Sequence, residues 1–247
     1  MAQFTEEEKI IRRIEKRFSK GLVEYGLIED GDKILIGLSG GKDSLALVEL
    51  LAKRARVFKP RFSVVAVHVV MKNIPYQSDL AYLREYVESW NIPFVLYETE
   101  FDASTDTRKS PCFLCSWNRR KALFTVAKEQ GCNKIALGHN EEDVLETFLL
   151  NLFYAGSIGT FSPKSYMNKS EITLIRPLIY APEKYIQNFV KRNNIEVMPK
   201  ACPMDGNSKR EDMKKLIQSF YKDLPHIRSN LYGAIKRAGL DGWKNDK

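Results

Sequence analysis

Short apolar segments alternate with longer amphipathic ones along most of the chain. Apolar, β-branched runs predict strands at about 33–38, 62–70, 93–97 and 134–138. Apolar residues at helical spacing predict helices at about 43–57, 78–91, 113–130 and 141–154. Buried strands that alternate with helices are typical of a parallel sheet with helices on both faces and right-handed crossovers. The pattern therefore predicts an α/β fold with a parallel sheet.

The N-terminal part of the chain has the pattern of a basic amphipathic helix over residues 5–20. Thr5 and Glu8 have the spacing of a capping box at its start. Its basic face leaves two interpretations open. The face contacts RNA phosphates, or it is a solvated surface of a helix packed at the edge of the domain.

After about residue 155 the pattern loosens, and Gly, Ser and Pro residues predict a loop. A short strand is expected at 172–175, and a helix starts near Pro182, a residue suited to the first helical position. Two further helical patterns cover about 208–222 and 225–238. We expect three segments: an N-terminal helical segment, a nucleotide-binding α/β domain and a C-terminal helical segment, over residues 1–30, 31–200 and 201–247.

The composition is that of an ordinary globular protein, with 44% hydrophobic and 28% charged residues among 247. No apolar stretch approaches the roughly 20 residues of a membrane helix, and the start of the chain lacks a signal-peptide core, so we expect a cytoplasmic protein. The net charge of +8 fits a polyanionic partner or a basic surface without one. In a reducing compartment the four cysteines favour metal or redox chemistry over disulfides.

The motif Ser39-Gly-Gly-Lys-Asp-Ser44 follows the first predicted strand and opens the first helix after it. Glycines let the backbone approach a ligand closely, and the free amides at a helix start attract anions. The motif therefore predicts a phosphate site, although an ordinary strand-to-helix turn also uses these residue types. It matches neither a Walker P-loop nor a dinucleotide-binding fingerprint.

Other polar residues lie near the ends of neighbouring predicted strands. Val67 and His68 lie near the end of the second strand, and Gly138 and His139 at the end of the fourth. Ligands of parallel sheets bind outside the carboxyl ends of the strands, so these residues and the motif are expected on one rim. Gly138 would admit a nucleotide closely, and His139 is expected to have a structural role.

Asp143 falls in the first turn of the helix that follows this strand. It is expected to point into the rim as a magnesium ligand or an acid–base group. The alternative is an acid that only favours the positive end of the helix dipole.

Two cysteines, Cys112 and Cys115, form a C-x-x-C pair on a predicted loop that enters a helix. The pair alone is compatible with zinc, an iron–sulfur cluster, dithiol chemistry or simple burial. Cys202 lies in a loop-like context and is a plausible third ligand, whereas Cys132 is expected to be a packed apolar thiol. A zinc site uses four ligands, so three cysteines favour an iron–sulfur cluster with one open iron.

Several motifs together resemble those of the TtcA family of tRNA 2-thiocytidine synthetases within the PP-loop ATP pyrophosphatases. They are Ser39–Ser44, Cys112-x-x-Cys115 with Arg119-Arg120, Ile135–His139, Glu146–Leu149, Asn151–Tyr154 and Ile175–Leu178. The resemblance covers about residues 30–215. It implies a Rossmann-like, adenine nucleotide α-hydrolase-like domain and a [4Fe–4S] cluster on Cys112, Cys115 and Cys202, with its fourth iron open to sulfide. The chain has Asn140-Glu141-Glu142 where the family often has His-Arg-Asp, and Asp205 where many members have another cysteine.

The resemblance implies ATP-dependent thiolation of a pyrimidine in the anticodon loop of a tRNA, with cytidine expected and uridine as the alternative. The implied cofactors are ATP, Mg²⁺ and the cluster, and the implied partners are tRNA, a cysteine desulfurase or free sulfide, and a second copy of the chain. Lys42, Asp143 and Arg119 are the expected catalytic residues, and Asp43 the expected Mg²⁺ ligand. The expected nucleotide-binding residues are Leu38, Ser39, Gly40, Gly41, Lys42, Asp43, Ser44, Val67, His68 and Gly138. A lysidine-type tRNA ligase, a small-molecule amide synthetase and a zinc-stabilised RNA-binding module are the rival functions.

Overall fold

A six-stranded sheet forms the centre of the protein, with the strand order β3-β2-β1-β4-β6-β5. The computed structural model describes residues 5–74, 78–102, 104, 110–199, 209–221, 223–240 and 242–244. The strands are β1 (Lys33–Gly37), β2 (Ser63–Met71), β3 (Phe94–Thr99), β4 (Lys134–Ala136), β5 (Lys164–Met167) and β6 (Ile172–Ile175). Neighbouring strands pair in parallel except for β5, which pairs antiparallel with β6 at the edge. The predicted α/β fold with a parallel sheet is confirmed, with one antiparallel edge strand added.

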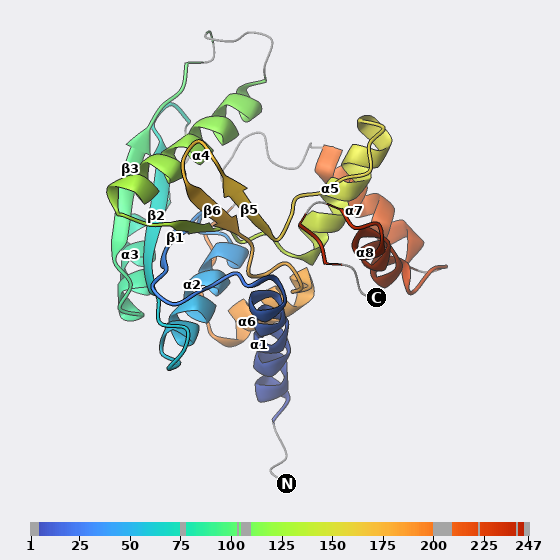
Figure 1. Ribbon diagram of the computed structural model, residues 1–247, viewed down its shortest axis with the longest axis horizontal. Helices are drawn as coiled ribbons and strands as arrows, with labels where there is room; N and C mark the ends of the chain where they lie inside the picture. The colour runs from blue at the N-terminus through green and yellow to red at the C-terminus, as the bar shows by residue number, and fades with distance from the viewer. Residues whose placement is uncertain are drawn as a thin grey trace.

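Helices cover both faces of this sheet (Figure 1). They are α1 (Glu6–Tyr25), α2 (Lys42–Ala55), α3 (Leu80–Ser89), α4 (Pro111–Glu129), α5 (Glu141–Tyr154), α6 (Glu183–Arg192), α7 (Lys209–Phe220) and α8 (Ile227–Arg237). Helix α4 packs against β1 to β4, while α2 packs against β1 and β2 and also contacts α6. The two terminal helical regions join this body, because α1 packs on α6, and α7 and α8 pack on α5.

The core lies in two layers that the alternation of side chains along β1 separates. Ile34 and Ile36 join the cluster that contains residues of α1, α2 and α6, and Leu35 joins the cluster beneath α4. All three side chains are fully buried. Successive side chains of a strand point to opposite faces, so a strand buried on both faces is apolar at every position.

Helix α1 begins as its sequence predicts. The Thr5 side chain accepts a hydrogen bond from the Glu8 amide, and the Glu8 carboxylate accepts one from the Thr5 amide, so the capping box is present. The helix is longer than the predicted 5–20 and ends at Tyr25, where Gly26 adopts a left-handed conformation with φ of 54°. Ile14 and Phe18 are buried, and the basic residues lie on the opposite face.

Three local predictions need correction. Helix α4 starts at Pro111 rather than near residue 113, because the Ser110 side chain caps it by accepting from the Phe113 amide. Pro182 is the N-cap residue of α6 and not its first helical residue. Strand β5 falls where only a loop was expected, since it forms by pairing with β6 and has no apolar alternation of its own.

No helix in the described part of the chain is long and apolar enough to cross a membrane.

Candidate active site

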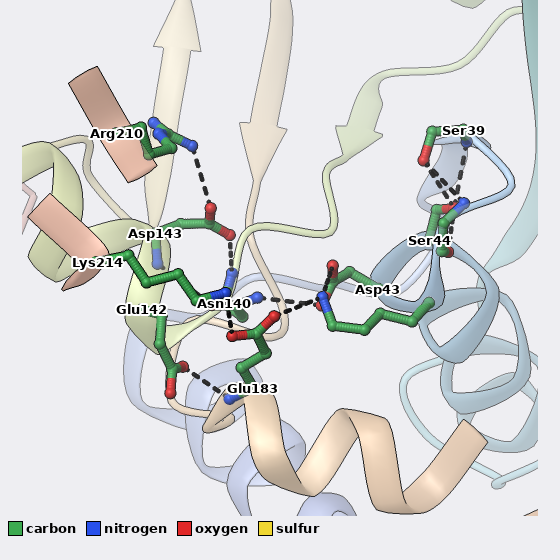
Figure 2. Close-up of polar contacts among 11 residues, drawn as sticks. Ser39, Asp43, Ser44, Asn140, Glu142, Asp143, Glu183, Arg210 and Lys214 are labelled. Atoms are coloured by element: carbon green, nitrogen blue, oxygen red, sulfur yellow. Dashed lines mark hydrogen bonds and ion pairs between the residues drawn. The ribbon is translucent and has the colours of Figure 1, made fainter. Parts of the chain in front are cut away.

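The loop between β1 and α2 is held by its two serines (Figure 2). The Ser39 and Ser44 hydroxyl oxygens lie 3.1 Å apart, and Ser44 Oγ donates to the Gly41 carbonyl at 2.9 Å. The Ser39 amide donates to Ser44 Oγ at 3.2 Å. Gly41 is the N-cap residue of α2 and supplies no side-chain cap. The loop is therefore closed while the first amides of α2 keep their capacity to bind an anion.

Gly40 is required at the tip of this loop. Its φ is 80°, a conformation that residues with a side chain rarely adopt, and an added Cβ would lie 2.7 Å from Cγ of Met198. The Met198 amide donates to the Gly40 carbonyl at 3.0 Å. The chain that follows α6 therefore returns to the predicted phosphate loop just before residues 200–208.

Lys42 takes part in a chain of ion pairs. Its ammonium lies 2.9 Å from Oδ2 of Asp43 and 3.0 Å from Oε1 of Glu183, and Glu183 also pairs with Lys214 at 2.9 Å. Burial disfavours the charge of Lys42, but the two carboxylates outweigh burial and raise the pKa of its ammonium. Lys42 is therefore a charged group at the start of α2, held by acids from two helices.

Asn140 links Asp43 to the helix α5. Its side chain donates to Oδ1 of Asp43 at 3.0 Å, and its own amide donates to Oδ2 of Asp143 at 2.9 Å. The Asp143 amide returns a bond to the Asn140 side chain at 3.2 Å, which completes a capping box. Asp143 Oδ1 accepts from Arg210 of α7 at 3.1 Å, so both oxygens have partners.

Asp143 thus lies on the predicted rim. It also stabilises the start of α5, which is the structural role that the alternative interpretation gave it. Burial raises the pKa of its carboxyl group, and this effect outweighs the opposing hydrogen bond from Asn140 and the charge of Arg210. Glu146, one turn further along α5, has its pKa raised to about 7 by burial and by the nearby charge of Asp143. A cation that replaced Arg210 here would meet the half-buried carboxyl group of Asp143 and the buried one of Glu146.

The acids Glu141 and Glu142 bind the C-terminal helices. Both pair with Arg228 of α8, and Glu142 Oε2 accepts from the Glu183 amide at 2.7 Å. These contacts fasten α8 and the start of α6 to the start of α5. Their role in the described residues is structural.

A cavity of about 130 Å³ lies beside the Ser39 end of the loop. It is lined by Gly37, Leu38, Ser39, Val67, His68, Val69, Arg119, Leu123 and Leu137. Four of the residues expected at the nucleotide and the expected catalytic Arg119 therefore share one cavity. Gly138 is not among its lining residues. A Cβ there would lie 3.2 Å from the carbonyl carbon of Asp43, so Gly138 permits close packing of the β4 turn against α2.

The C-x-x-C pair lies in the first turns of α4 and not on a loop before it. Cys112 is exposed and Cys115 half-buried. Residues three apart lie on the same face of a helix, so both sulfurs can face one metal centre. Among the described residues no three His, Cys, Asp or Glu side chains form a metal site. Cys202 lies outside those residues, and Cys132 is buried at 5% exposure in the apolar cluster beneath α4, as expected.

A buried arginine follows β6 on the same edge of the sheet. Arg176 Nε donates to Nδ1 of His139 at 3.3 Å, and Phe161 packs against both side chains. Burial lowers the pKa of His139 to about 3, which fits its expected structural role as a neutral hydrogen-bond acceptor. Burial and the charge of Arg120 lower the pKa of Arg176 to about 10. Arg176 also donates to the Ser162 carbonyl and to Oγ of Ser165 at 3.5 Å, so neutral acceptors hold its buried guanidinium.

Sequence reasoning missed three charged residues of this site. They are Glu183, Arg210 and Lys214. Each lies in an amphipathic helix far along the chain from the phosphate loop. No spacing distinguished them from ordinary surface charges, and only the packing of α6 and α7 brings them to α2 and α5.

Comparisons with known proteins agree with this geometry. The family model described as "PP-loop domain" matches residues 6–218. A tRNA-cytidine(32) 2-sulfurtransferase of Syntrophotalea carbinolica is 36% identical over 93% of this chain and 90% of its own. One of Pelobacter propionicus is 36% identical over 92% of this chain and 86% of its own.

Two solved structures share the fold. The U34-tRNA thiolase NcsA of Methanococcus maripaludis, solved with its [4Fe-4S] cluster, has a TM-score of 0.76 at 22% identity, over 94% of this chain and 79% of its own. An NH3-dependent NAD synthetase of Campylobacter jejuni has a TM-score of 0.50 at 15% identity, over 99% of each chain. Identities this low establish only a common fold.

Proposed function

The chain belongs to the PP-loop domain family and, within it, to the tRNA-cytidine(32) 2-sulfurtransferases, and we propose that it replaces the 2-oxygen of cytidine 32 in tRNA by sulfur at the cost of ATP. The observation that carries this proposal is identity of 36% over 93% of the chain to such an enzyme. ATP binds through the PP-loop, Ser39 to Ser44. The free amides of α2 and the Lys42 ammonium supply the positive charge that ATP phosphates need.

The reaction has two displacements. The 2-oxygen of cytosine attacks the α-phosphorus, the bond to the bridging oxygen breaks, and pyrophosphate leaves. Sulfide then attacks C2, the C2–O bond breaks, and AMP leaves with the oxygen. Lys42 neutralises charge on the departing pyrophosphate, and Asp43 lies where it can hold Mg²⁺ on the phosphates, with Asp143 linked to it through Asn140. Catalysis by such a clamp consists of positioning and charge stabilisation.

Sulfur delivery is assigned to the cysteines. Cys112 and Cys115 present two thiol groups on one face of α4, and thiolates are the usual ligands of iron–sulfur clusters. A [4Fe–4S] cluster on these two residues and Cys202 would supply an iron that holds sulfide. The stretch 200–208 is bounded on one side by Met198, which contacts Gly40, and on the other by Arg210, which contacts Asp143. The described residues on either side of this stretch therefore contact the predicted nucleotide site, which supports Cys202 as the third ligand.

The tRNA is assigned to the basic surface beside the site. Arg13, Lys16, Arg17 and Lys20 of α1 line a groove of about 460 Å³ with Tyr185 of α6. Tyr185 belongs to α6, the helix whose Glu183 contacts Lys42 of the PP-loop. The exposed Arg120 and Lys121 offer further positive charge on α4, the helix that carries the C-x-x-C pair. Phosphate contacts of this kind supply most of the affinity for RNA and position the target base.

The decisive experiment detects the product. Anaerobically reconstituted protein is incubated with ATP, sulfide and tRNA, and the digested tRNA is analysed for 2-thiocytidine by mass spectrometry. We expect 2-thiocytidine only when ATP is present, and none in tRNA whose cytidine 32 is replaced by uridine. Absence of any thionucleoside would refute the proposal. A lysidine-type ligase or amide synthetase would instead cleave ATP with Cys112, Cys115 and Cys202 all replaced by alanine.

The supplier of sulfur and the assembly state complete the proposal. A cysteine desulfurase or free sulfide supplies the sulfur, and the active form is a homodimer. Light scattering of the purified protein measures its mass and so tests for the homodimer directly.

A further inference from the structure

Two large aromatic side chains lie exposed on successive turns of α4. Phe113 is 47% exposed and Trp117 is 53% exposed. Lys121 follows one turn later, and its ammonium lies 5.7 Å from the centre of the Trp117 ring. Residues four apart lie on one face of a helix, so Phe113, Trp117 and Lys121 form a continuous row, called here the α4 stripe. Single exposed aromatic residues are ordinary on protein surfaces, whereas neighbouring ones are candidates for an interaction surface.

The α4 stripe begins at the edge of the sheet that carries the PP-loop. Helix α4 follows β3 and leads into β4, and both belong to the parallel part of the sheet, so its first turns lie at the carboxyl edge. Trp117 lies two residues after Cys115 and two residues before Arg119. Arg119 lines the same cavity as Ser39 of the PP-loop. A group bound on the stripe would therefore lie on the solvent side of α4, beside the candidate active site.

The helix around the stripe is basic. From Pro111 to Lys128 it contains four basic residues and no acidic one, and the four are Arg119, Arg120, Lys121 and Lys128. Arg120 and Lys121 are exposed. Single-stranded RNA presents flat bases that stack on aromatic rings and phosphates that bind cations. Exposed rings with cations beside them therefore match unpaired nucleotides better than they match an apolar protein surface.

We propose that Trp117 stacks on an unpaired base of the anticodon loop of the bound tRNA, and that Lys121 binds the phosphate beside that base. This inference rests on the proposed function, because it takes tRNA as the partner. The stacked base is a neighbour of the target cytidine and not the target itself. The target has to reach the PP-loop and the cysteines, whereas Trp117 faces solvent. Stacking of the neighbour holds the loop while the target base leaves its stack.

The first arm of the test changes the ring. Binding of tRNA to the anaerobically reconstituted full-length protein is measured by fluorescence anisotropy, without ATP or sulfide. Trp117→Ala should weaken binding about tenfold, the effect of one lost stack between a base and an aromatic ring. Trp117→Phe should keep most of the affinity. Trp117→Leu should not, because leucine is apolar but has no flat ring.

Salt dependence separates stacking from charge. The loss in Trp117→Ala should be the same factor at low and at high salt, because stacking releases no counterion from a phosphate. Lys121→Gln should instead reduce the slope of log affinity against log salt by about 1. A loss in Trp117→Ala that disappears at high salt would overturn the assignment of Trp117 to a base.

The second arm removes the base. tRNAs are assembled from synthetic fragments with one abasic nucleotide at each position of the anticodon loop in turn. At one position other than 32, the abasic nucleotide should weaken binding to the wild type about tenfold and leave binding to Trp117→Ala unchanged. Additive losses at every position would overturn the proposal, because no base would then depend on the ring.

The matched control is Phe58→Ala. Phe58 is 71% exposed, and the guanidinium carbon of Arg61 lies 5.1 Å from the centre of its ring. The loop that carries both residues joins α2 to the start of β2, so it lies at the edge of the sheet opposite the PP-loop. Phe58→Ala should bind tRNA as the wild type does. Equal losses in Phe58→Ala and Trp117→Ala would overturn a specific role for Trp117.

The outcomes distinguish this inference from the proposed function. Unchanged tRNA binding in Trp117→Ala would overturn the inference alone. If that variant also had a lower mass in light scattering, the α4 stripe would be an interface between two copies of the chain. A wild type that binds no tRNA would refute both. A wild type that binds tRNA through Trp117 but forms no 2-thiocytidine would refute the proposed function and leave the inference standing.

Discussion

The ammonium of Lys42 lies 3.0 Å from a carboxylate oxygen of Glu183, a residue of α6. Asp43 contacts the same ammonium at 2.9 Å, and Lys214 of α7 contacts the other oxygen of Glu183 at 2.9 Å. Acids and bases therefore alternate from α2 through α6 to α7 before any nucleotide is bound. A pyrophosphate group that approaches Lys42 competes with carboxylates already in place, so Glu183 helps position the lysine.

Replacing Lys42 by methionine should lower ATP-dependent pyrophosphate release by about 100- to 1000-fold, the usual cost of one group that stabilises transition-state charge. Methionine keeps the length of the side chain and removes the charge. The matched control is Lys59→Met, because Lys59 is exposed and pairs only loosely with Asp30 at 3.9 Å. Equal losses in both variants would contradict the assigned role.

Replacing Glu183 by glutamine should destabilise the protein by about 1–2 kcal/mol at neutral pH, since two lysines then lose a charged partner. Burial opposes ionisation of Glu183, but Lys214 and Lys42 outweigh burial and lower the pKa of its carboxyl group. Urea unfolding measures the change. An unchanged free energy of unfolding would show that the ion pairs contribute nothing net.

Glu146 should make the stability depend on pH. Its pKa is raised to about 7 in the folded protein, from 4.5, so between these values the folded state binds more protons than the unfolded state. Stability therefore falls as pH rises from 5 to 8. Glu146→Gln should remove this fall and gain about 2 kcal/mol relative to the wild type over that range. The exposed Glu85→Gln should behave like the wild type.

The cysteines offer a matched pair of substitutions. Cys112→Ala should abolish bound iron and visible absorption after anaerobic reconstitution, while ATP binding persists. Cys132→Ala should retain the iron and lose about 1 kcal/mol of stability, because Cys132 is buried among apolar side chains. Iron and acid-labile sulfide per chain are the measurements. Loss of iron from the Cys132 variant alone would reverse the assignment.

The basic groove of α1 predicts a salt effect. Lys16→Gln with Lys20→Gln should weaken tRNA binding and reduce the slope of log affinity against log salt by about 1 to 2, one for each lost phosphate contact. Lys128→Gln, in the last turn of α4, is the control. Helix α4 connects parallel strands and ends at the edge of the sheet opposite the PP-loop. An unchanged slope in the double variant would place the tRNA elsewhere.

Local signals explain which parts of the structure could be predicted. Helix α5 was expected over 141–154 and has these bounds, because Asn140 caps it and its apolar pattern is strong. The PP-loop was predicted because six adjacent residues contain the strand end, the turn and the helix start. Strand β5 was missed, since Lys164–Met167 has no strand pattern and depends on β6 for its pairing.

The candidate site likewise contains residues that local signals predicted and residues that they did not. Ser39 and Asp143 follow strands and His68 lies in the last part of β2, and the rule that ligands bind at the carboxyl edge of a parallel sheet predicted that they share one rim. Glu183 and Arg210 reach the site only through the packing of α6 on α2 and of α7 on α5. Contacts between surface-like helices have no local signal, because an amphipathic helix has the same pattern wherever it packs.

The close approach of Gly138 to Asp43 limits how this protein can evolve. A methyl group at position 138 would lie 3.2–3.3 Å from the backbone and Cβ of Asp43, and the neighbour would have to shift by a few tenths of an ångström. Displacements of that size matter for groups that hold a reacting phosphate. Substitutions at positions 43 and 138 are therefore coupled. A side chain added in the turn after β4 requires a compensating change at the start of α2. Gly138 therefore limits the substitutions that both the turn after β4 and the start of α2 can accept.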